Sequence, residues 1–555
     1  MSVYLQKRPK LSWAIRWPVS RLEISSEALI AAVSLYFVVA CNSVFWHSLS
    51  RNGASPGLMA SFFVAVFSLH ALLLALLSPG RLLKPLLGTL LVVTGFATFY
   101  MTRYAVLFDV EMINNVLQTD AAESRELLSI GMLLHVAVFG VAPAAALFWV
   151  RVKPRTFKSG FASRAIFVAT MGVLAGLAIA ISSQGIFAMM RSDKALRYQI
   201  TPGNYIVSFV RAVTASPDLP PSARLPVAAD ARIAAQSADR KPRVLVMVVG
   251  ETVRAENWGL NGYSRQTTPK LAEREVINFS QVQSCGTSTE VSLPCMFSVF
   301  GRDNYDKQKI RNHESLLDVV ARAGVKVQWR DNQSGCKGVC DGVGIERMSD
   351  SIAPELCTAG RCLDDILLTD LQSRIDSSTG DVLVVLHQLG NHGPNYFERY
   401  PAEYEVFKPT CRTPELSQCT SEQIVNAYDN AIVYTDAFLS RTLDVLKAQT
   451  THDAAMLYVS DHGESLGEYG LYLHGAPYAI APQQQLHVPM ALWMSSELAS
   501  DSGIDLHCMR ERSNEPRSHD NLFHSVLGLF EIQTQAYQRN RDVFAECRSG
   551  SIASR

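Results

Sequence analysis

The chain has 555 residues, which is long enough for two or three domains. Charged residues make up 18% of the sequence and their formal charges sum to +0, so the composition gives no sign of a nucleic-acid partner. The mean hydropathy of +0.09 is high for a soluble enzyme. It reflects an uneven chain, because roughly the first 190 residues are strongly apolar and the remainder has the composition of an ordinary globular protein.

Five apolar segments in the first part are predicted to span a membrane: Ala28–Trp46, Leu58–Leu77, Leu86–Met101, Ile130–Val150 and Ala165–Met190. A hydrocarbon core about 30 Å thick is crossed by about 20 helical residues, so four of these segments are long enough. The third reaches that length only if Leu82–Pro85 extends it, with Lys84 directed to the membrane surface. A cleaved signal peptide is not expected, because the first apolar run is too long and four more follow it.

The distribution of basic residues predicts the orientation of these helices. One side of the membrane would hold Lys7, Arg8, Lys10, Arg16, Arg21, Arg81, Lys84, Arg151, Lys153, Arg155, Lys158 and Arg164, and the other would hold Arg51, Arg103 and Arg125. Because cytoplasmic loops are enriched in lysine and arginine, we expect the N-terminus in the cytoplasm. Five crossings then place everything after Met190 outside the cytoplasm.

The segment after the apolar part is predicted to be a linker with some helix. Within it, Ala215–Pro226 is rich in proline, and Val227–Arg240 is rich in alanine and charged residues. We therefore expect a transmembrane domain over residues 1–190, a linker over 191–240 and a soluble domain over 241–555.

The soluble part has the pattern of an α/β domain. Helical stretches such as Ser315–Ala323 and Glu422–Leu446 lie between short apolar runs. These runs are predicted to be buried strands: Val244–Val249, Lys326–Trp329, Asp381–Leu386, Ala454–Val459 and Val488–Trp493. Near-continuous apolar strands that alternate with helices predict a mostly parallel sheet covered on both faces. In such sheets, functional groups gather beyond the carboxyl ends of the strands.

The cysteines indicate an oxidising compartment for this domain. Cys41 stands alone in an apolar run, whereas the other ten all lie beyond residue 280 and are closely spaced. Zinc sites are the alternative, but the sequence contains no CxxC pair. Disulfides in this domain agree with the orientation predicted from the basic residues.

Polar residues that follow the predicted strands form a candidate metal and catalytic site. The first strand ends in Gly250–Thr252, another in His387–Gly393 and a third in Ser460–Ser465, with His474 shortly beyond. Carboxylate, hydroxyl and imidazole groups at one edge of a sheet are suitable ligands for zinc. Taken singly, a glutamate after a strand is more often a helix cap, and His387 can be a core histidine. Their joint position at strand ends favours the functional interpretation.

Six ordered motifs resemble the lipid A phosphoethanolamine transferases, which include polymyxin-resistance enzymes within the alkaline-phosphatase/sulfatase superfamily. The motifs are VVGET, SCGTSTEVSLPCMFS, WRDNQSGCKG, HQLGNHGP, SDHGESLGE and YLHGAPY. The resemblance covers the whole chain. It implies an α-helical domain of five transmembrane helices in the inner membrane of a Gram-negative cell, followed by an α/β periplasmic catalytic domain with a mostly parallel sheet.

The resemblance also implies a zinc ion as cofactor. Its ligands would be Glu251, Thr289, Asp461 and His462. Thr289 would also be the nucleophile that becomes modified with phosphoethanolamine. The other hydroxyls of CGTST are chemically similar, so the choice of Thr289 rests on the resemblance.

Further matches concern the substrate. Lys337, His392 and His474 match phosphate-binding and proton-transfer groups, and the family also shows additional zinc at such histidines. Ser334 matches a substrate-binding serine. Gln333 is left unassigned, because some relatives carry asparagine at that position.

A membrane-side segment near residues 108–127 matches a periplasmic helix that closes over the lipid head group. Asn115, Thr119 and Glu123 lie four residues apart, so they are expected to share one helix face and to contact substrate. An exposed amphipathic helix is the alternative.

Spacing alone does not determine how the cysteines pair. The resemblance implies the pairs Cys285–Cys295, Cys336–Cys340, Cys357–Cys362 and Cys411–Cys419, which leaves Cys508 for Cys547. The first two pairs flank Thr289 and Lys337 and are therefore expected to fix the loops that carry them.

The resemblance implies transfer of phosphoethanolamine from phosphatidylethanolamine to a lipopolysaccharide acceptor, with a lipid A phosphate as the expected acceptor, through a phosphothreonine intermediate. The added amine would lower negative surface charge and so confer resistance to polymyxin and other cationic peptides. The expected partners are these lipids and the bilayer, and a monomer is expected. The alternatives are transfer of phosphoethanolamine or phosphoglycerol to another periplasmic glycan, a sulfatase-like hydrolase, and a silent membrane sensor. CGTST lacks the CxPxR-type sequence of sulfatases, and no zinc ligand is missing as a silent sensor would require.

Overall fold

The computed structural model describes residues 21–119, 121–215, 219–234, 240–358 and 360–549, except for the side chains of residues 121–123. The chain forms two compact units. The first comprises Met1–Ser43, Leu49–Phe96 and His135–Met189, and the second comprises Val44–Ser48, Ala97–Leu134 and Met190–Arg555. Residues 97–134, from the middle of the apolar part, therefore pack with the C-terminal domain.

Among the residues that the structure describes, four helical stretches are long and apolar enough to cross a membrane. They are Pro56–Leu77 (α3), Gly80–Tyr104 (a short turn followed by α4, Leu83–Tyr104), Ile130–Trp149 (α7, Ile130–Val136, through α8, Ala142–Trp149) and Phe157–Ile181 (α9). A bent pair, α1 (Ser26–Ala40) and α2 (Ser43–Arg51), makes a fifth if it counts as one span. The structure thus has four to five apolar spans.

Two of the predicted spans are interrupted. The first bends by 51° between α1 and α2, where the Asn42 side chain donates to the backbone carbonyl of Phe37 at 2.8 Å. The last does not continue to Met190 as predicted, because α9 ends at Ile181 and a separate helix, α10 (Ser183–Ser192), follows. Adjacent serines at this break fit the tendency of such residues to bend helices.

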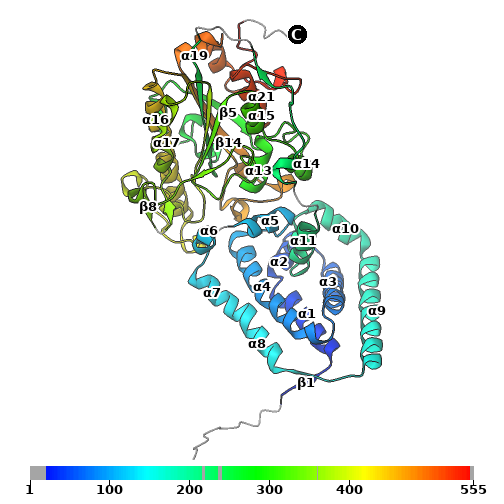
Figure 1. Cartoon of the computed structure of the whole chain (residues 1–555). Coiled ribbons are helices and arrows are strands. Elements are labelled where there is room, and N and C mark those ends of the chain that lie inside the picture. The colour runs from blue at the N-terminus through cyan, green and yellow to red at the C-terminus, as the bar shows by residue number, and fades with distance from the viewer. Residues whose placement is uncertain (1–20, 120, 216–218, 235–239, 359, 550–555) are drawn as a thin grey trace, which may run out of the picture. The chain divides into compact units, whose positions relative to one another are not determined.

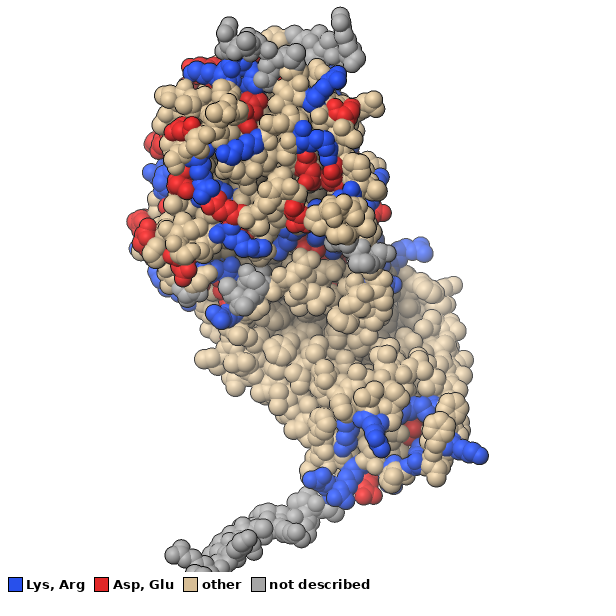
Figure 2. Space-filling model, in the orientation of Figure 1, with Lys and Arg blue, Asp and Glu red and all other residues tan. Residues whose placement is uncertain are grey.

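The surface of the first unit suits a lipid environment. In Figure 2 the visible face of these helices is largely free of charge, and lysine and arginine gather at one end of the unit. Val173, Leu177 and Ile181 of α9 are 60%, 54% and 81% exposed. At the charged end, Arg155 pairs with Glu27 at 2.9 Å. Apolar side chains exposed over whole helices are expected where lipid tails replace water.

The membrane-side segment near residues 108–127 is two helices, so the predicted continuous helix is wrong. Helix α5 (Val110–Gln118) ends where Thr119 takes an extended backbone conformation, and α6 (Ala121–Glu126) follows. The Thr119 hydroxyl donates to the carbonyl of Asn115 at 2.9 Å, which satisfies one of the carbonyls left free at the end of α5. Asn115 and Glu123 therefore belong to two different helices.

The predicted linker contains regular structure. Helix α11 (Gly203–Thr214) packs against α5, and its Ser208 hydroxyl donates to the carbonyl of Phe108 at 3.0 Å. Strand β3 (Arg232–Ile233) pairs with β16 (Ile532–Gln533) near the end of the chain.

The C-terminal domain is built on an eight-stranded sheet in the order β15-β5-β14-β11-β4-β10-β6-β7. These strands are β15 (Arg517–Ser518), β5 (Ile277–Gln283), β14 (His487–Met494), β11 (Asp453–Ser460), β4 (Arg243–Gly250), β10 (Val382–His387), β6 (Lys326–Asp331) and β7 (Glu346–Arg347). Among these described strands, β14 alone runs against its neighbours. The predicted α/β domain with a mostly parallel sheet is confirmed.

Helices cover both faces of this sheet. Figure 1 shows α17 (Ser421–Lys447) on one side, and α13 (Thr289–Met296), α15 (Leu316–Arg322) and α21 (Asp520–Leu529) on the other. Every residue of β4 is buried. Since both faces are covered, polar groups come together at the edge where the parallel strands end.

Candidate active site and metal centre

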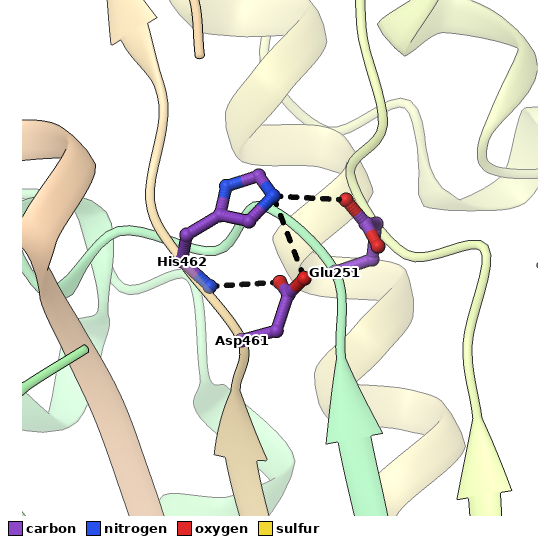
Figure 3. Close-up of side chains that lie close together, drawn as sticks. All are labelled: Glu251, Asp461 and His462. Atoms are coloured by element: carbon purple, nitrogen blue, oxygen red, sulfur yellow. Dashed lines mark hydrogen bonds and ion pairs between the residues drawn. The ribbon is translucent and has the colours of Figure 1, made fainter. Parts of the chain in front are cut away.

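Three side chains at the carboxyl ends of two neighbouring strands form a compact buried group. Glu251 follows β4, and Asp461 and His462 follow β11, which pairs with β4 in parallel. Their potential ligand atoms all lie within 4.8 Å of one another, and each residue is fully buried (Figure 3). Nε2 of His462 is 3.4 Å from Oε1 of Glu251 and 3.4 Å from Oδ2 of Asp461.

The electrostatics of this group suit a bound cation. Burial and the nearby Glu251 carboxylate raise the pKa of Asp461 to about 6. Burial disfavours the charged imidazole of His462, but Asp461 and Glu251 outweigh it and raise the His462 pKa to about 9. Burial also opposes ionisation of Glu251. The hydrogen bond with His462 and the positive charge of the His462 imidazole outweigh this effect and hold the Glu251 pKa below its usual range.

The hydrogen bonds around the group leave ligand atoms available. The Nδ1–H of His462 lies 2.9 Å from the carbonyl of Gly463, which can only accept, so Nε2 is the atom turned toward the carboxylates. Oδ2 of Asp461 is buried and finds no hydrogen-bond partner among the described residues. Two carboxylates and an imidazole that converge in this way fit a divalent metal such as zinc.

Thr289 lies against this group at the first residue of α13. Its hydroxyl donates toward Glu251, 3.1 Å from Oε1 and 3.0 Å from Oε2, and lies 3.4 Å from Nε2 of His462. The nearby Thr287 hydroxyl instead donates to the carbonyl of Ala476 at 2.7 Å. Of these two threonines, the structure brings Thr289 to the metal-ligand candidates.

Gln333 is a site residue that the sequence analysis left unassigned. Its side-chain amide donates to Oε2 of Glu251 at 2.9 Å. Next to it, Ser334 accepts a hydrogen bond of 2.8 Å from the ammonium group of Lys337. Gln333 therefore connects the loop that carries Ser334 and Lys337 to Glu251. The motif WRDNQSGCKG contained the signal, since an amide next to two assigned residues is a natural partner for a ligand carboxylate.

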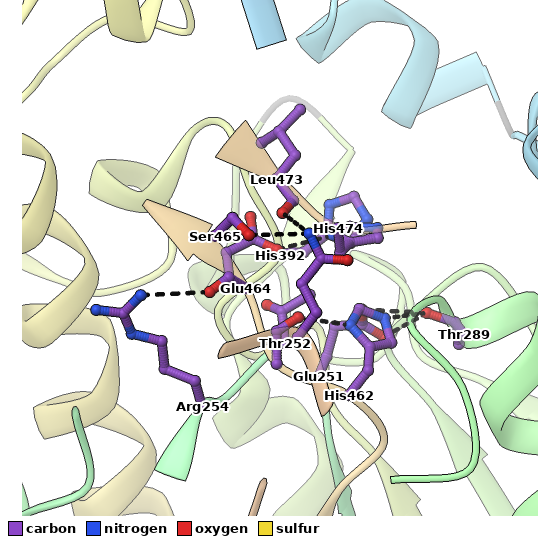
Figure 4. Close-up of polar contacts among 12 residues, drawn as sticks. Glu251, Thr252, Arg254, Thr289, His392, His462, Glu464, Ser465, Leu473 and His474 are labelled. Atoms are coloured by element: carbon purple, nitrogen blue, oxygen red, sulfur yellow. Dashed lines mark hydrogen bonds and ion pairs between the residues drawn. The ribbon is translucent and has the colours of Figure 1, made fainter. Parts of the chain in front are cut away.

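A group of histidines borders the metal-ligand candidates (Figure 4). The ring centroids of His462 and His474 are 4.5 Å apart, and those of His474 and His392 are 5.4 Å apart. Nδ1 of His474 lies 2.8 Å from Oε2 of Glu464, and Oε1 of Glu464 accepts a hydrogen bond of 2.6 Å from the Tyr396 hydroxyl. Glu464 thus orients His474. The sequence analysis includes Glu464 in the motif SDHGESLGE but assigns it no role.

Burial determines the charge of His392. Burial is the largest cause, and it outweighs the attraction of Glu251 and lowers the His392 pKa to about 3, with the positive charge of Arg399 acting in the same direction. His392 is therefore uncharged at neutral pH in this structure. His387 differs, because its Nδ1 lies 2.8 Å from Asp331 in the domain core. This contact supports the alternative that His387 is a core histidine without a role at the site.

Contact of the membrane-side residues with substrate stays a prediction. Asn115 and Thr119 are partly buried at the end of α5, and the side chain of Glu123 lies outside the described residues. Instead, the Gln118 amide donates to Oε1 of Glu290 at 3.0 Å. Glu290 directly follows Thr289, so α5 contacts the helix that carries the nucleophile candidate.

The described residues hold five disulfides, all in the C-terminal domain. They are Cys285–Cys295, Cys336–Cys340, Cys357–Cys362, Cys411–Cys419 and Cys508–Cys547, the same pairs as the resemblance implies. The first two close loops around Thr289 and Lys337. Cys41 is buried and is not part of a disulfide.

Comparison with known proteins gives matches over both parts of the chain. The family described as "Phosphoethanolamine transferase EptA/EptB" matches residues 66–216, and the family described as "Sulfatase" matches residues 243–532. The chain is 38% identical over 496 residues to phosphoethanolamine transferase EptA of Escherichia coli (strain K12), covering 87% of this chain and 89% of that protein. It is 35% identical over 533 residues to phosphatidylethanolamine transferase Mcr-1 of Escherichia coli, covering 92% and 96%.

Solved structures agree with these matches. The integral membrane lipooligosaccharide phosphoethanolamine transferase A (EptA) from Neisseria meningitidis superposes with a TM-score of 0.91 at 38% identity, covering 95% of this chain and all of that one. The separately solved soluble domain of the Neisseria meningitidis transferase gives a TM-score of 0.58 at 47% identity, covering 59% of this chain and 99% of that one.

Proposed function

Because the chain belongs to the EptA/EptB family of phosphoethanolamine transferases, we propose that it transfers phosphoethanolamine from phosphatidylethanolamine to a phosphate of lipid A. The observation that carries this proposal is the Thr289 hydroxyl, held 3.0–3.1 Å from Glu251 beside the buried group of Asp461 and His462. A hydroxyl next to a metal site is a suitable nucleophile for a covalent intermediate.

In this proposal Glu251, Thr289, Asp461 and His462 hold one zinc ion. When bound there, zinc lowers the pKa of a coordinating hydroxyl and offsets negative charge on the phosphoryl oxygens. Support comes from the unpartnered Oδ2 of Asp461 and from the orientation of Nε2 of His462. Gln333 keeps the Glu251 carboxylate oriented through its hydrogen bond.

The chemistry takes two displacements. In the first, the Thr289 oxygen forms a bond to the phosphorus of phosphatidylethanolamine, the bond from phosphorus to the diacylglycerol oxygen breaks, and that oxygen takes up a proton. In the second, a lipid A phosphate oxygen forms a bond to the phosphorus of the phosphothreonine, the bond from phosphorus to the Thr289 oxygen breaks, and that oxygen regains its proton. His392 and His474 are the candidates for moving these protons, and the cation of Lys337 neutralises charge on the phosphate.

A cavity beside the site supports lipid substrates. It has a volume of about 460 Å³ and reaches His474. Its apolar walls include Met101, Leu107, Met112 and Ile480, from both the membrane-side segment and the C-terminal domain, all within the second unit. A mostly apolar pocket with a few polar groups at one end suits an amphipathic ligand.

The cellular arrangement is part of the proposal. Residues 1–190 would form the transmembrane domain, 191–240 the connection and 241–555 the catalytic domain. Five disulfides in the C-terminal domain support a periplasmic location, and the basic residues support a cytoplasmic N-terminus. Neutralising lipid A phosphates with an amine would reduce the binding of polymyxin and other cationic peptides.

The test is mass spectrometry of lipid A from Gram-negative cells that express the chain or its Thr289→Ala variant. The wild type should add phosphoethanolamine to lipid A phosphates, and the variant should add none. If a core sugar or another glycan is modified in place of lipid A, that molecule is the acceptor and the proposal of lipid A is wrong. Equal modification by the two chains would overturn the assignment of Thr289.

A further inference from the structure

The backbone of His392 is held by one arginine. Nε of Arg399 donates to the carbonyl of His392 at 2.7 Å, and the Arg399 side chain is 1% exposed. The two residues mark the ends of a short loop, so this hydrogen bond closes the loop on itself. The ring of His392 faces His474 at the site described above.

The middle of the same loop is held by a hydrogen bond from Tyr396. The Tyr396 hydroxyl donates to Glu464 at 2.6 Å, and the other oxygen of that carboxylate lies 2.8 Å from His474. Tyr396 and Arg399 therefore hold the loop at two points. The contact of Tyr396 with Glu464 lies entirely within the catalytic domain.

The attachment through Arg399 depends on the membrane-side segment. Glu126, at the end of α6, binds the remaining nitrogens of Arg399, with Nη1 at 3.4 Å from Oε1 and Nη2 close to Oε2. Glu126 also pairs with Nε of Arg361 at 2.9 Å. Burial opposes ionisation of Glu126, but Arg399 and Arg361 outweigh it and lower the Glu126 pKa, so the pair is charged.

We propose that Glu126 and Arg399 are positioning residues that set the place of His392 in the active site. The inference rests on the proposed function, in which His392 acts on the transferred group. Glu126 binds Nη1 and Nη2 of the Arg399 guanidinium, and Nε of the same guanidinium holds the His392 carbonyl. Removal of Glu126 frees Arg399 to rotate, and the loop then loses its second point of attachment.

The geometry requires an arginine. A guanidinium presents donors on both edges of a rigid plane, so it can bind a carboxylate with two nitrogens and a carbonyl with the third. A lysine at position 399 could form the ion pair with Glu126 but has no rigid second edge to hold the carbonyl. Arg399→Lys therefore separates the ion pair from the positioning of His392.

Arg361 provides a matched control. It binds the same Glu126 carboxylate, yet it belongs to the hairpin of β8 (Cys357–Thr358) and β9 (Arg361–Cys362). Arg361→Gln removes an ion pair of similar type while leaving the hydrogen bond from Arg399 to His392 in place. A role of Glu126 limited to stability would make Arg361→Gln and Glu126→Gln behave alike.

The experiment uses the full chain in vesicles of phosphatidylethanolamine and lipid A, with kcat and KM measured from radiolabelled donor and folding followed by Tm. Misplacing a catalytic group by about 1 Å can cost roughly 100-fold in rate, so Glu126→Gln and Arg399→Lys should lower kcat by about 10- to 100-fold with KM little changed. Arg361→Gln should keep nearly the wild-type kcat. In the His392→Ala background, Arg399→Lys should cause no further loss.

Two results would overturn the inference. One is wild-type kcat for Arg399→Lys, and the other is an equal loss of kcat for Glu126→Gln and Arg361→Gln. Wild type and Thr289→Ala run alongside as the limits of the assay. Absence of transfer by the wild type contradicts the proposed function itself, and equal transfer by those two chains overturns the assignment of Thr289, so these failures are distinguishable from failure of the inference.

Discussion

Replacing Gln333 with alanine should weaken zinc binding without breaking the fold. The change removes the 2.9 Å hydrogen bond from the amide to Oε2 of Glu251, a fully buried carboxylate. Loss of a partner that orients a ligand typically costs 10- to 100-fold in metal affinity. That range corresponds to about 1.4–2.7 kcal/mol at 25 °C. A hydrogen bond to a charged group contributes about 1.5–3 kcal/mol, so the two estimates agree.

The assay is competition for zinc between the purified full chain and a chelator of known affinity. Gln388→Ala is the matched control, because the amide of Gln388 also donates to a carboxylate, Oδ2 of Asp364 at 3.3 Å. Gln388 is fully buried, whereas Gln333 is partly buried. Asp364 is not part of the metal-ligand group. Gln388→Ala should therefore lower Tm while its zinc affinity stays near that of the wild type.

Transfer activity gives a second readout for the same variant. With excess zinc, Gln333→Ala should regain most of its transfer rate, because the ligands themselves are intact. An unchanged zinc affinity in Gln333→Ala would refute the reasoning, and so would an equal loss in Gln388→Ala.

Three further predictions concern the nucleophile, the disulfides and the membrane part. Thr289→Ala should fold and yield no phosphothreonine by mass spectrometry, whereas Thr287→Ala should retain clear activity; a modified residue in Thr289→Ala would point to another nucleophile. Replacing Cys285 and Cys295 together with serine should lower the free energy of unfolding by about 2–4 kcal/mol, measured by denaturant titration, and no change would show that this disulfide is not stabilising. A fragment starting at Lys241 should fold and bind zinc, yet fail on phosphatidylethanolamine in a bilayer, because Glu126 and the cavity walls from the membrane-side segment are missing; full transfer by the fragment would make the membrane part a simple anchor.

The sequence predicted the central sheet because its strands are buried on both faces. The run Val244–Val249 is continuously apolar, and the structure extends it by one residue at each end as β4. Strand β5 was missed, since Ile277–Gln283 alternates between buried and more exposed residues and includes Asn278, Ser280 and Gln281. A pattern of that kind resembles a polar loop unless its neighbours in the sheet are known. The direction of β14 likewise depends on long-range pairing.

The membrane-side segment shows a different limit of sequence reasoning. The spacing of Asn115, Thr119 and Glu123 predicts a shared face only if the helix continues. Its end at Thr119 depends on local backbone geometry, because a threonine hydroxyl can bond a carbonyl one turn earlier and compete with the helix. The ion pair of Glu126 with Arg399 joins residues 273 positions apart, so no local pattern in the sequence could indicate it.

The order of the five disulfides bears on how the protein matures. Among the ten cysteines of the C-terminal domain, each disulfide joins two that are consecutive along the chain, and four of the five pairs are separated by only 4 to 10 positions. An oxidase that joins cysteines in the order in which they emerge during export would produce this pattern directly. We therefore expect the yield of oxidised protein to depend on the oxidase and little on an isomerase that reshuffles mispaired thiols, which strains lacking either activity can show.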